Sequence, residues 1–168
     1  EGDRARIQDA QLAELVDFYL RTHRPECPAV LVGDFNIDGA DHLPTAERGR
    51  YAALMAALGS LGMVDMWAAR NGGQGCTAYL DGSARAMRDA IAPLDGSGRY
   101  CQDTGPCLVG RTNRIDYIFA ECPSARHAVR LDLTRPRRVP FRRARETGGM
   151  AYLSDHIGLE TTLVARPA

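Results

Sequence analysis

The feature that most constrains this chain is a short apolar run, residues 30–32, that stops on Gly33 and is followed at once by Asp34, Phe35 and Asn36. A short apolar run with β-branched residues, bounded by turn formers, predicts a buried strand. Because side chains alternate along an extended backbone, we expect Asp34 and Asn36 to share one face and Phe35 to pack on the other. A carboxylate beside an amide suits a hard divalent cation and a phosphate oxygen, although the same pair is also typical of a turn.

Length and composition predict one globular domain over residues 1–168. The chain has 168 residues, enough for one domain with a hydrophobic core, and 45% of them are apolar. No apolar run is long enough for a transmembrane segment, and the first residues lack the layout of a signal peptide. The 21 basic and 21 acidic side chains cancel, so no overall field attracts nucleic acid or an anionic membrane. Nothing in the sequence indicates an oligomeric state.

The five cysteines show neither the density of a disulfide scaffold nor the C-x-x-C spacing of a zinc site. Cys101 and Cys107 flank a turn-rich loop that a disulfide could close. A disulfide there favours a secreted protein. The alternative is a set of free thiols in a cytoplasmic protein.

Hydrophobic periodicity predicts the other elements. A helix is expected over residues 7–20, with Ile7, Leu15 and Phe18 facing the core, and a second helix over residues 48–61 is closed by Gly62. The remaining strands are expected at residues 76–80, 114–120, 128–133 and 156–165. Irregular structure is expected at residues 64–67 and in a long loop over residues 134–153. That loop carries six arginines, Arg135, Arg137, Arg138, Arg142, Arg143 and Arg145.

Three motifs follow one another at the ends of predicted strands: GDFN at residues 33–36, RIDYIF at residues 114–119 and SDH at residues 154–156. Together and in this order they resemble the endonuclease/exonuclease/phosphatase superfamily, which has the deoxyribonuclease I-like fold. The resemblance spans nearly the whole chain and is closest to the sphingomyelinase-like phosphodiesterases.

The resemblance implies an α/β (α+β) fold, a four-layer sandwich of two facing mixed β-sheets with outer helices. In that family an N-terminal half carries a metal-binding Glu and a further catalytic His. Neither has a counterpart before the first predicted helix, and Glu14 lies on the exposed side of that helix. We therefore expect this chain to supply the C-terminal portion of such a domain, with the missing N-terminal half as a partner.

The resemblance also implies a role for each motif residue. Asp34 would assist the nucleophilic water and bind a metal ion, and Asn36 would orient the water or hold the phosphate. Asp116 would fix the tautomer of His156, and His156 would contact the scissile phosphate. Asp155 would be a metal ligand. Because the family site offers oxygen ligands, Mg²⁺ is the expected ion, with Mn²⁺ or Ca²⁺ as alternatives.

These roles predict a metal-dependent phosphodiester hydrolase, because phosphodiester cleavage needs a cation, an activated water and a proton donor. Arg142 and Arg143 are candidate substrate-binding residues, since arginine suits phosphate. The substrate is expected to be a phospholipid headgroup or nucleic acid. The alternatives are a Mg²⁺-dependent endonuclease or exonuclease acting on DNA, and a non-catalytic fragment of such an enzyme.

Simpler interpretations remain open for individual residues. Asp116 could pair with Arg114 across the strand, and Asp155 with His156 could form a turn at the start of a strand. His127 is more typical of the surface than of a site. Trp67 is more typical of the core or a cleft wall than of a ligand-stacking position.

Overall fold

The computed structural model describes residues 2–39, 45–71, 77–79, 112–144 and 150–168. Within these ranges, only the backbone is described for residues 2, 45–48, 78–79, 112–113, 140–144, 150–155 and 157. The helices are α1 (Gly2–Thr22), α2 (Thr45–Gly59) and α3 (Met66–Asn71). The strands are β1 (Val30–Asp34), β2 (Met63–Asp65), β3 (Ala78–Tyr79), β4 (Thr112–Asn113), β5 (Asp116–Glu121), β6 (Val129–Leu133), β7 (Arg137–Ala144), β8 (Met150–Glu160) and β9 (Leu163–Pro167).

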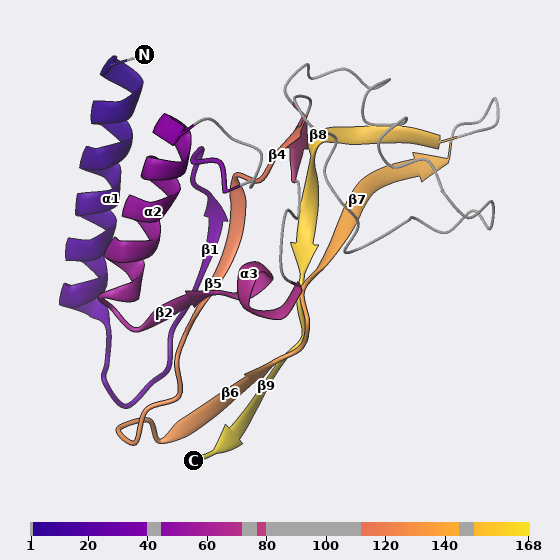
Figure 1. Ribbon diagram of the computed structural model, residues 1–168. Coiled ribbons are helices and arrows are strands. Elements are labelled where there is room, and N and C mark those ends of the chain that lie inside the picture. Colours follow the sequence, from indigo (N-terminus) through magenta and orange to yellow (C-terminus); the bar gives the residue numbers. More distant parts are fainter. Residues whose placement is uncertain (1, 40–44, 72–76, 80–111, 145–149) are drawn as a thin grey trace.

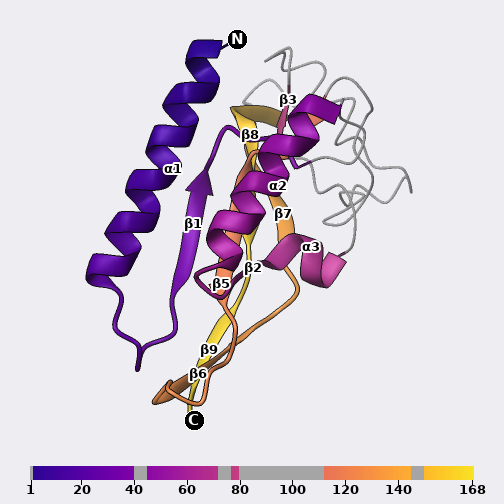
Figure 2. The same ribbon diagram turned by 60° about the vertical axis from the view of Figure 1, so that its left-hand side comes forward.

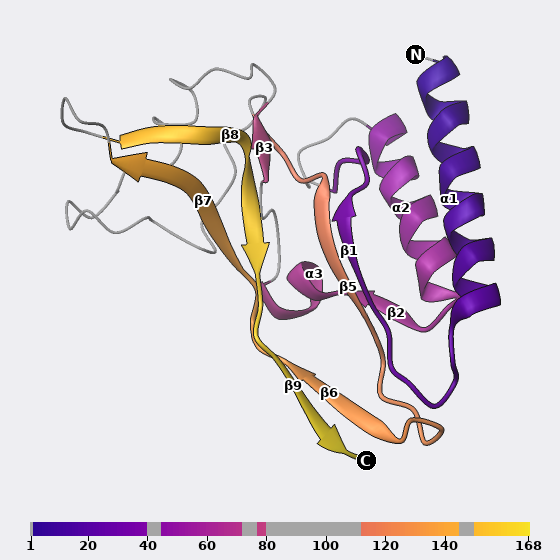
Figure 3. The same cartoon turned by 180° about the vertical axis from the view of Figure 1, so that it is seen from behind.

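The fold is α+β, with antiparallel sheets; α1 and α2 lie together, and α3 lies apart from them beside β5 (Figure 1). One sheet has the strand order β1-β5-β2, a second has the order β4-β3-β8-β7, and β6 pairs with β9 in a two-stranded ribbon. Seen from behind, the β7–β8 hairpin continues into the β6–β9 ribbon, which ends at the C-terminus (Figure 3). No helix in the described part of the chain is long and apolar enough to cross a membrane.

The main core lies between the β1-β5-β2 sheet and the helices α1 and α2 (Figure 2). Leu54 and Leu58 of α2 are fully buried, as is Phe119 of β5, and Leu31 of β1 packs against them. Odd-numbered residues of β1 and β5 therefore face the helices, as expected for strands whose side chains alternate between the two faces.

The opposite face of the same sheet carries a smaller apolar cluster. Ile118 and Ala120 of β5 are buried there with Met66, and Leu133 of β6 and Leu159 of β8 pack against them. The even-numbered residues of β5 thus face β8, and those of β1 lie on the same face of the sheet. Polar side chains at even positions near the end of β1 and the start of β5 therefore share this face.

Several predictions from the sequence are confirmed. The expected helices correspond to α1 and α2, and the expected strands at residues 114–120 and 128–133 correspond to β5 and β6. The strand expected from residue 30 is β1, which ends at Asp34. The short strand expected at residues 76–80 appears as β3. Gly62 follows α2 with a φ of 76°, a left-handed conformation that glycine adopts without strain.

The prediction that residues 64–67 are irregular is wrong, because they form β2 and the start of α3. Asp65 caps α3: its Oδ1 accepts hydrogen bonds from the backbone N–H of Trp67 at 2.9 Å and of Ala68 at 3.2 Å. An aspartate at this position satisfies N–H groups that a helix leaves without partners. The cap makes a six-residue helix possible in a segment too short to show periodicity.

The predicted loop over residues 134–153 is also wrong, because it contains β7 and the first residues of β8. The single strand predicted at residues 156–165 is instead split between β8 and β9. The split occurs at Thr161 and Thr162, where Thr162 N–H donates to Thr134 Oγ1 at 2.9 Å and Thr161 Oγ1 donates to Thr134 O at 2.8 Å. These bonds turn the chain away from β7 and toward β6.

The predicted buried face of α1 is only partly right. Tyr19, predicted for this face, packs on the core, but Ile7 and Phe18 are 55% and 57% exposed. Gln8 and Leu12, which were not predicted for it, lie against the core instead. The buried stripe is displaced because Gln8 reaches the loop after β1, where its Nε2 donates to a backbone carbonyl. A polar side chain with a specific partner therefore sets the rotation of this helix.

Candidate active site

Two carboxylates lie directly opposite each other at the end of the β1–β5 pair. The register pairs Asp34 with Asp116. Glu121 N–H donates to Ala29 O at 2.9 Å and Phe35 N–H donates to Ile115 O at 2.8 Å, so the odd positions of β1 form the hydrogen-bonded pairs. Asp34 and Asp116 are therefore a non-hydrogen-bonded pair, in which opposed side chains lie closest. Both project from the same face of the sheet as Ile118 and Ala120, the face on which β8 contacts β5.

The Asp34 carboxylate is oriented by Asn36. Asn36 N–H donates to Asp34 Oδ1 at 2.7 Å, and Asn36 Nδ2 donates to Asp34 Oδ2 at 3.2 Å. Asn36 has a φ of 52° and lies outside the strand. The prediction that Asp34 and Asn36 share one face through strand alternation is wrong in its reason, because Asn36 lies beyond the strand. A left-handed turn, which asparagine tolerates well, brings them together.

Helix α1 holds Asn36 in that turn. Gln8 Nε2 donates to the Asn36 carbonyl at 2.5 Å, and Arg4 Nη2 donates to Asn36 Oδ1 at 3.3 Å. The amide of Asn36 therefore accepts from Arg4 through its oxygen and donates to Asp34 through its nitrogen. This arrangement fixes which way the amide points.

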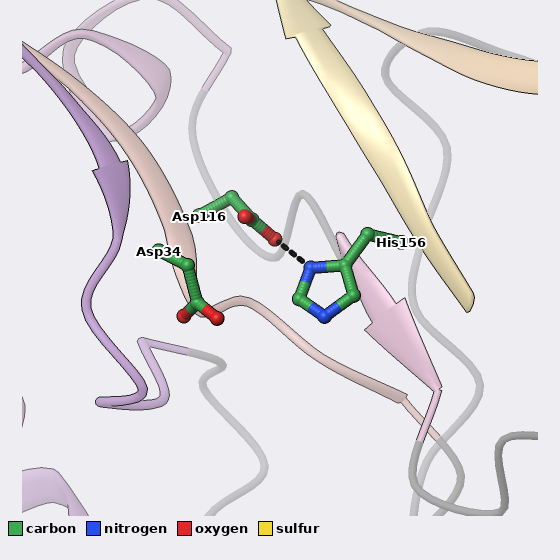
Figure 4. A group of neighbouring side chains, drawn as sticks. All are labelled: Asp34, Asp116 and His156. Atoms are coloured by element: carbon green, nitrogen blue, oxygen red, sulfur yellow. Dashed lines mark hydrogen bonds and ion pairs between the residues drawn. The ribbon is translucent and has the colours of Figure 1, made fainter. Parts of the chain in front are cut away.

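The second carboxylate, Asp116, pairs with His156 of β8. His156 Nδ1 lies 2.9 Å from Asp116 Oδ2, and the two side chains are 30% and 22% exposed (Figure 4). A carboxylate can only accept a hydrogen bond, so the shared proton belongs to Nδ1. The alternative that Asp116 pairs with Arg114 is wrong, because Arg114 Nη1 contacts Asp65 Oδ2 at 2.5 Å.

Asp34, Asp116 and His156 form one group, called here the carboxylate–histidine site. One ligand atom from each lies within 4.8 Å of the other two, and the three side chains point toward one another (Figure 4). Two carboxylates with an imidazole are donors that suit a hard or borderline divalent cation. The side chains are exposed or half-buried, so small molecules can reach them.

Behind the site lies a buried group, called here the Arg114 cluster, that consists of Arg114, Asp65, Tyr51 and Tyr117. The Arg114 guanidinium lies 5.1 Å from the centre of the Tyr51 ring and 4.7 Å from that of Tyr117, both within cation–π range. Tyr51 Oη donates to Asp65 Oδ2 at 2.7 Å. Burial raises the pKa of Tyr51 to about 12, with Asp65 adding to the effect and Arg114 opposing it.

The Arg114 cluster holds the loop after β1 against the start of β5. Tyr117 Oη lies 2.6 Å from Ile37 O, and Arg114 N–H donates to Asp38 Oδ1 at 2.8 Å. Gly39 closes the contact: a Cβ at this position would lie 2.6 Å from Arg114 Nη2 and 2.7 Å from Tyr117 Oη. Only glycine fits there without displacing the cluster. The loop that follows Asp34 and the strand that begins at Asp116 are therefore held together.

Some predicted site residues are not tested. Asp155 lies next to His156 in β8, but its side chain is outside the described residues. The backbones of Arg142 and Arg143 pair with Tyr152 and Ala151 of β8, and their side chains are likewise outside the described part. The possible disulfide partners Cys101 and Cys107 lie outside the described residues altogether.

Sequence reasoning missed several residues that support the site. The buried polar side chains that support it are Gln8, Asp65, Thr77 and Arg114. The only sequence signals for them are that Arg114 belongs to the RIDYIF motif and that the partner of Gln8, Asn36, belongs to the GDFN motif. His127 was also misjudged, because it is 5% exposed rather than superficial, and its Nε2 lies 3.3 Å from Glu121.

Trp67 is 1% exposed and belongs to the core. It therefore does not stack on a ligand in this conformation.

Comparison with known proteins gives no relative: no family model, curated protein or solved structure matches the chain. The case for a function rests on the carboxylate–histidine site and on its supports.

Proposed function

We propose that this protein is a metal-dependent phosphodiester hydrolase whose reaction takes place at the carboxylate–histidine site. The observation that carries the proposal is the placement of Asp34, Asp116 and His156, whose ligand atoms lie within 4.8 Å of one another. The three come from separate motifs, yet they meet at one end of a sheet.

The two opposed carboxylates need a reason, because like charges directly across a strand pair destabilise a sheet. Asp34 and Asp116 occupy such a pair, and among the described side chains neither has an arginine partner of the kind that Asp65 has in Arg114. Of these two carboxylates, only Asp116 lies within hydrogen-bond distance of His156 among the described contacts. A divalent cation between the carboxylates removes the repulsion, and this is the simplest role for the arrangement.

Asp34 and Asp116 are the residues that would hold the metal ion, with Mg²⁺ as the first candidate and Mn²⁺ or Ca²⁺ as alternatives. When bound, such an ion neutralises phosphate charge and lowers the pKa of a water ligand. Asp116 keeps the proton of His156 on Nδ1, which makes Nε2 the basic nitrogen of the neutral ring. His156 would thus exchange a proton with the reacting water or the leaving oxygen through Nε2.

Asn36 is the proposed phosphate-orienting group. Its amide is fixed by Arg4 and Asp34, so it presents a constant geometry at the edge of the site. A pre-oriented amide stabilises developing charge without having to reorganise during the reaction.

The proposal extends to a larger fold, a four-layer sandwich to which the chain contributes its C-terminal half. In β1 the N–H and C=O groups of the even positions, including Val32, point away from β5, and no described strand pairs with that edge. Val32 is 64% exposed and shares its face with Asp34. Open, apolar strand edges recruit another strand, which supports an N-terminal half as the partner.

Hydrolysis of bis-p-nitrophenyl phosphate in the presence of Mg²⁺ or Mn²⁺ tests the activity, with wild type and His156→Ala compared. Loss of a general acid or base is expected to lower the rate by about 10²–10⁴-fold. Glu160→Gln, on the same strand but paired with Arg137, serves as the matched control and should retain the wild-type rate.

Sphingomyelin vesicles and plasmid DNA, assayed in parallel, distinguish a phospholipid headgroup from nucleic acid as substrate. Hydrolysis without a divalent cation, or hydrolysis unaffected by His156→Ala, would contradict the proposed site.

A further inference from the structure

Thr77 touches the site from behind and connects its two halves. It is fully buried directly before β3, and its Oγ1 accepts hydrogen bonds from Ile115 N–H at 3.2 Å and from Asp116 N–H at 3.0 Å. The next residue, Ala78, pairs with His156 in the β3–β8 ladder. Two consecutive residues therefore contact Asp116 through a side chain and His156 through the backbone.

The ladder explains why a side chain is needed at this point. Strand β2 pairs with β5 only from Phe119 to Glu121, so the start of β5 has no β2 residue beside it. The Asp116 N–H points to that side, because Asp116 belongs to a non-hydrogen-bonded pair with β1. The hydroxyl of Thr77 takes the place of the missing strand. One hydroxyl oxygen has two lone pairs and can accept from both amides.

We propose that Thr77 is a positioning residue that sets Asp116 against His156 across the junction of the two sheets. The inference rests on the proposed function and adds a residue that touches neither metal nor substrate. Thr77 holds the backbone of Asp116 through its hydroxyl, and the adjacent Ala78 holds the backbone of His156. The 2.9 Å contact between the Asp116 and His156 side chains therefore depends on these two consecutive residues. Groups that orient metal ligands from behind commonly change affinity when removed.

Thr77→Val tests the proposal, because valine keeps the shape of threonine and removes the acceptor. Thr77→Ser keeps the acceptor and should restore the wild-type behaviour. Thr134→Val is the matched control: Thr134 Oγ1 also accepts a backbone N–H, from Thr162 at 2.9 Å, but at the far end of β6. Circular dichroism confirms that each variant is folded.

Two readouts separate positioning from a general loss of stability. Long-range ¹H–¹⁵N NMR of the His156 ring should show the Nδ1–H tautomer in wild type, Thr77→Ser and Thr134→Val, and a shift toward Nε2–H in Thr77→Val. The dissociation constant for Mn²⁺ should rise about 10-fold or more in Thr77→Val and change by less than about twofold in the other two. An unchanged tautomer together with unchanged Mn²⁺ affinity in Thr77→Val would overturn the proposal.

If Thr77→Val does not fold, amide hydrogen exchange of the wild type tests the role of Thr77 instead. The amides of Ile115 and Asp116 should be protected at a level similar to that of paired β5 amides, and unprotected exchange at both would overturn the inference.

Failure of the proposed function gives a different result. A wild type that neither binds Mn²⁺ nor cleaves a phosphodiester contradicts that function, whereas the tautomer and the amide exchange still decide the role of Thr77.

Discussion

Two pairs, each of a carboxylate and a basic side chain, lie near the start of β5 and have opposite characters. Asp65 and Arg114 meet at 2.5 Å with side chains 1% and 2% exposed, whereas Asp116 and His156 meet at 2.9 Å with side chains 22% and 30% exposed. The first pair is enclosed by two tyrosine rings. The second lies beside a further carboxylate, that of Asp34. Similar contacts therefore serve different purposes according to what surrounds them.

The difference shows how a structural ion pair differs from the pair that we propose to be reactive. The Arg114 cluster surrounds its charges with aromatic rings, a tyrosine hydroxyl and backbone groups, so its geometry is fixed and solvent is excluded. The carboxylate–histidine site keeps excess negative charge in contact with solvent, which is costly for folding and useful for binding a cation. Partial exposure together with an unbalanced charge is the combination on which the proposed function rests.

The largest effect is expected from removing the positive charge of the buried Asp65–Arg114 pair. Arg114→Met should lower the free energy of unfolding by about 3–5 kcal/mol, because it leaves the Asp65 carboxylate buried and without its cation. Urea unfolding followed by circular dichroism measures this. Arg137→Met removes one partner of an exposed pair with Glu160 and should cost about 1 kcal/mol or less. Equal losses in the two variants would show that burial does not distinguish the pairs.

A smaller change tests whether the Arg114 cluster helps to position the carboxylate–histidine site. Gly39→Ala places a Cβ within 2.7 Å of Arg114 Nη2 and Tyr117 Oη, and overpacking of this kind costs about 1–3 kcal/mol. Thermal unfolding measures the loss.

Gly49→Ala is the matched control for this change, because a Cβ at Gly49 meets nothing within 4 Å and lies in α2, where alanine is favoured. We also expect Gly39→Ala to weaken Mn²⁺ binding, since the same loop follows Asp34. Full retention of Mn²⁺ affinity alongside the stability loss would show that the Arg114 cluster does not position the site.

The strands that carry the site could be predicted from sequence because their signals are local. Residues 30–36 and 114–120 have the apolar, β-branched composition of strands, and the motif order pointed to Asp34, Asp116 and His156, which the structure brings together. The Arg114 cluster could not be predicted in this way. Its central ion pair joins residues 49 positions apart, and Asp65 lies in a segment without periodicity.

The β7–β8 hairpin was missed for a different physical reason. Arginine-rich residues 134–153 lack the apolar alternation that marks a half-buried strand, so their composition predicts a loop. Arginine is nevertheless compatible with a strand when its partner strand offers a carboxylate, as Glu160 does for Arg137. Strand pairing between distant segments thus overrides local composition.

Direct Mn²⁺ binding is the measurement that tests the central claim most directly. Electron paramagnetic resonance of free Mn²⁺ would be titrated against wild type, Asp34→Asn, Asp116→Asn and the control Glu160→Gln. We predict one site in wild type and in Glu160→Gln, with affinity reduced about 10-fold or more in both aspartate variants. Equal binding by all four proteins, or no binding by the wild type, would contradict the claim that Asp34, Asp116 and His156 form a metal-dependent active site.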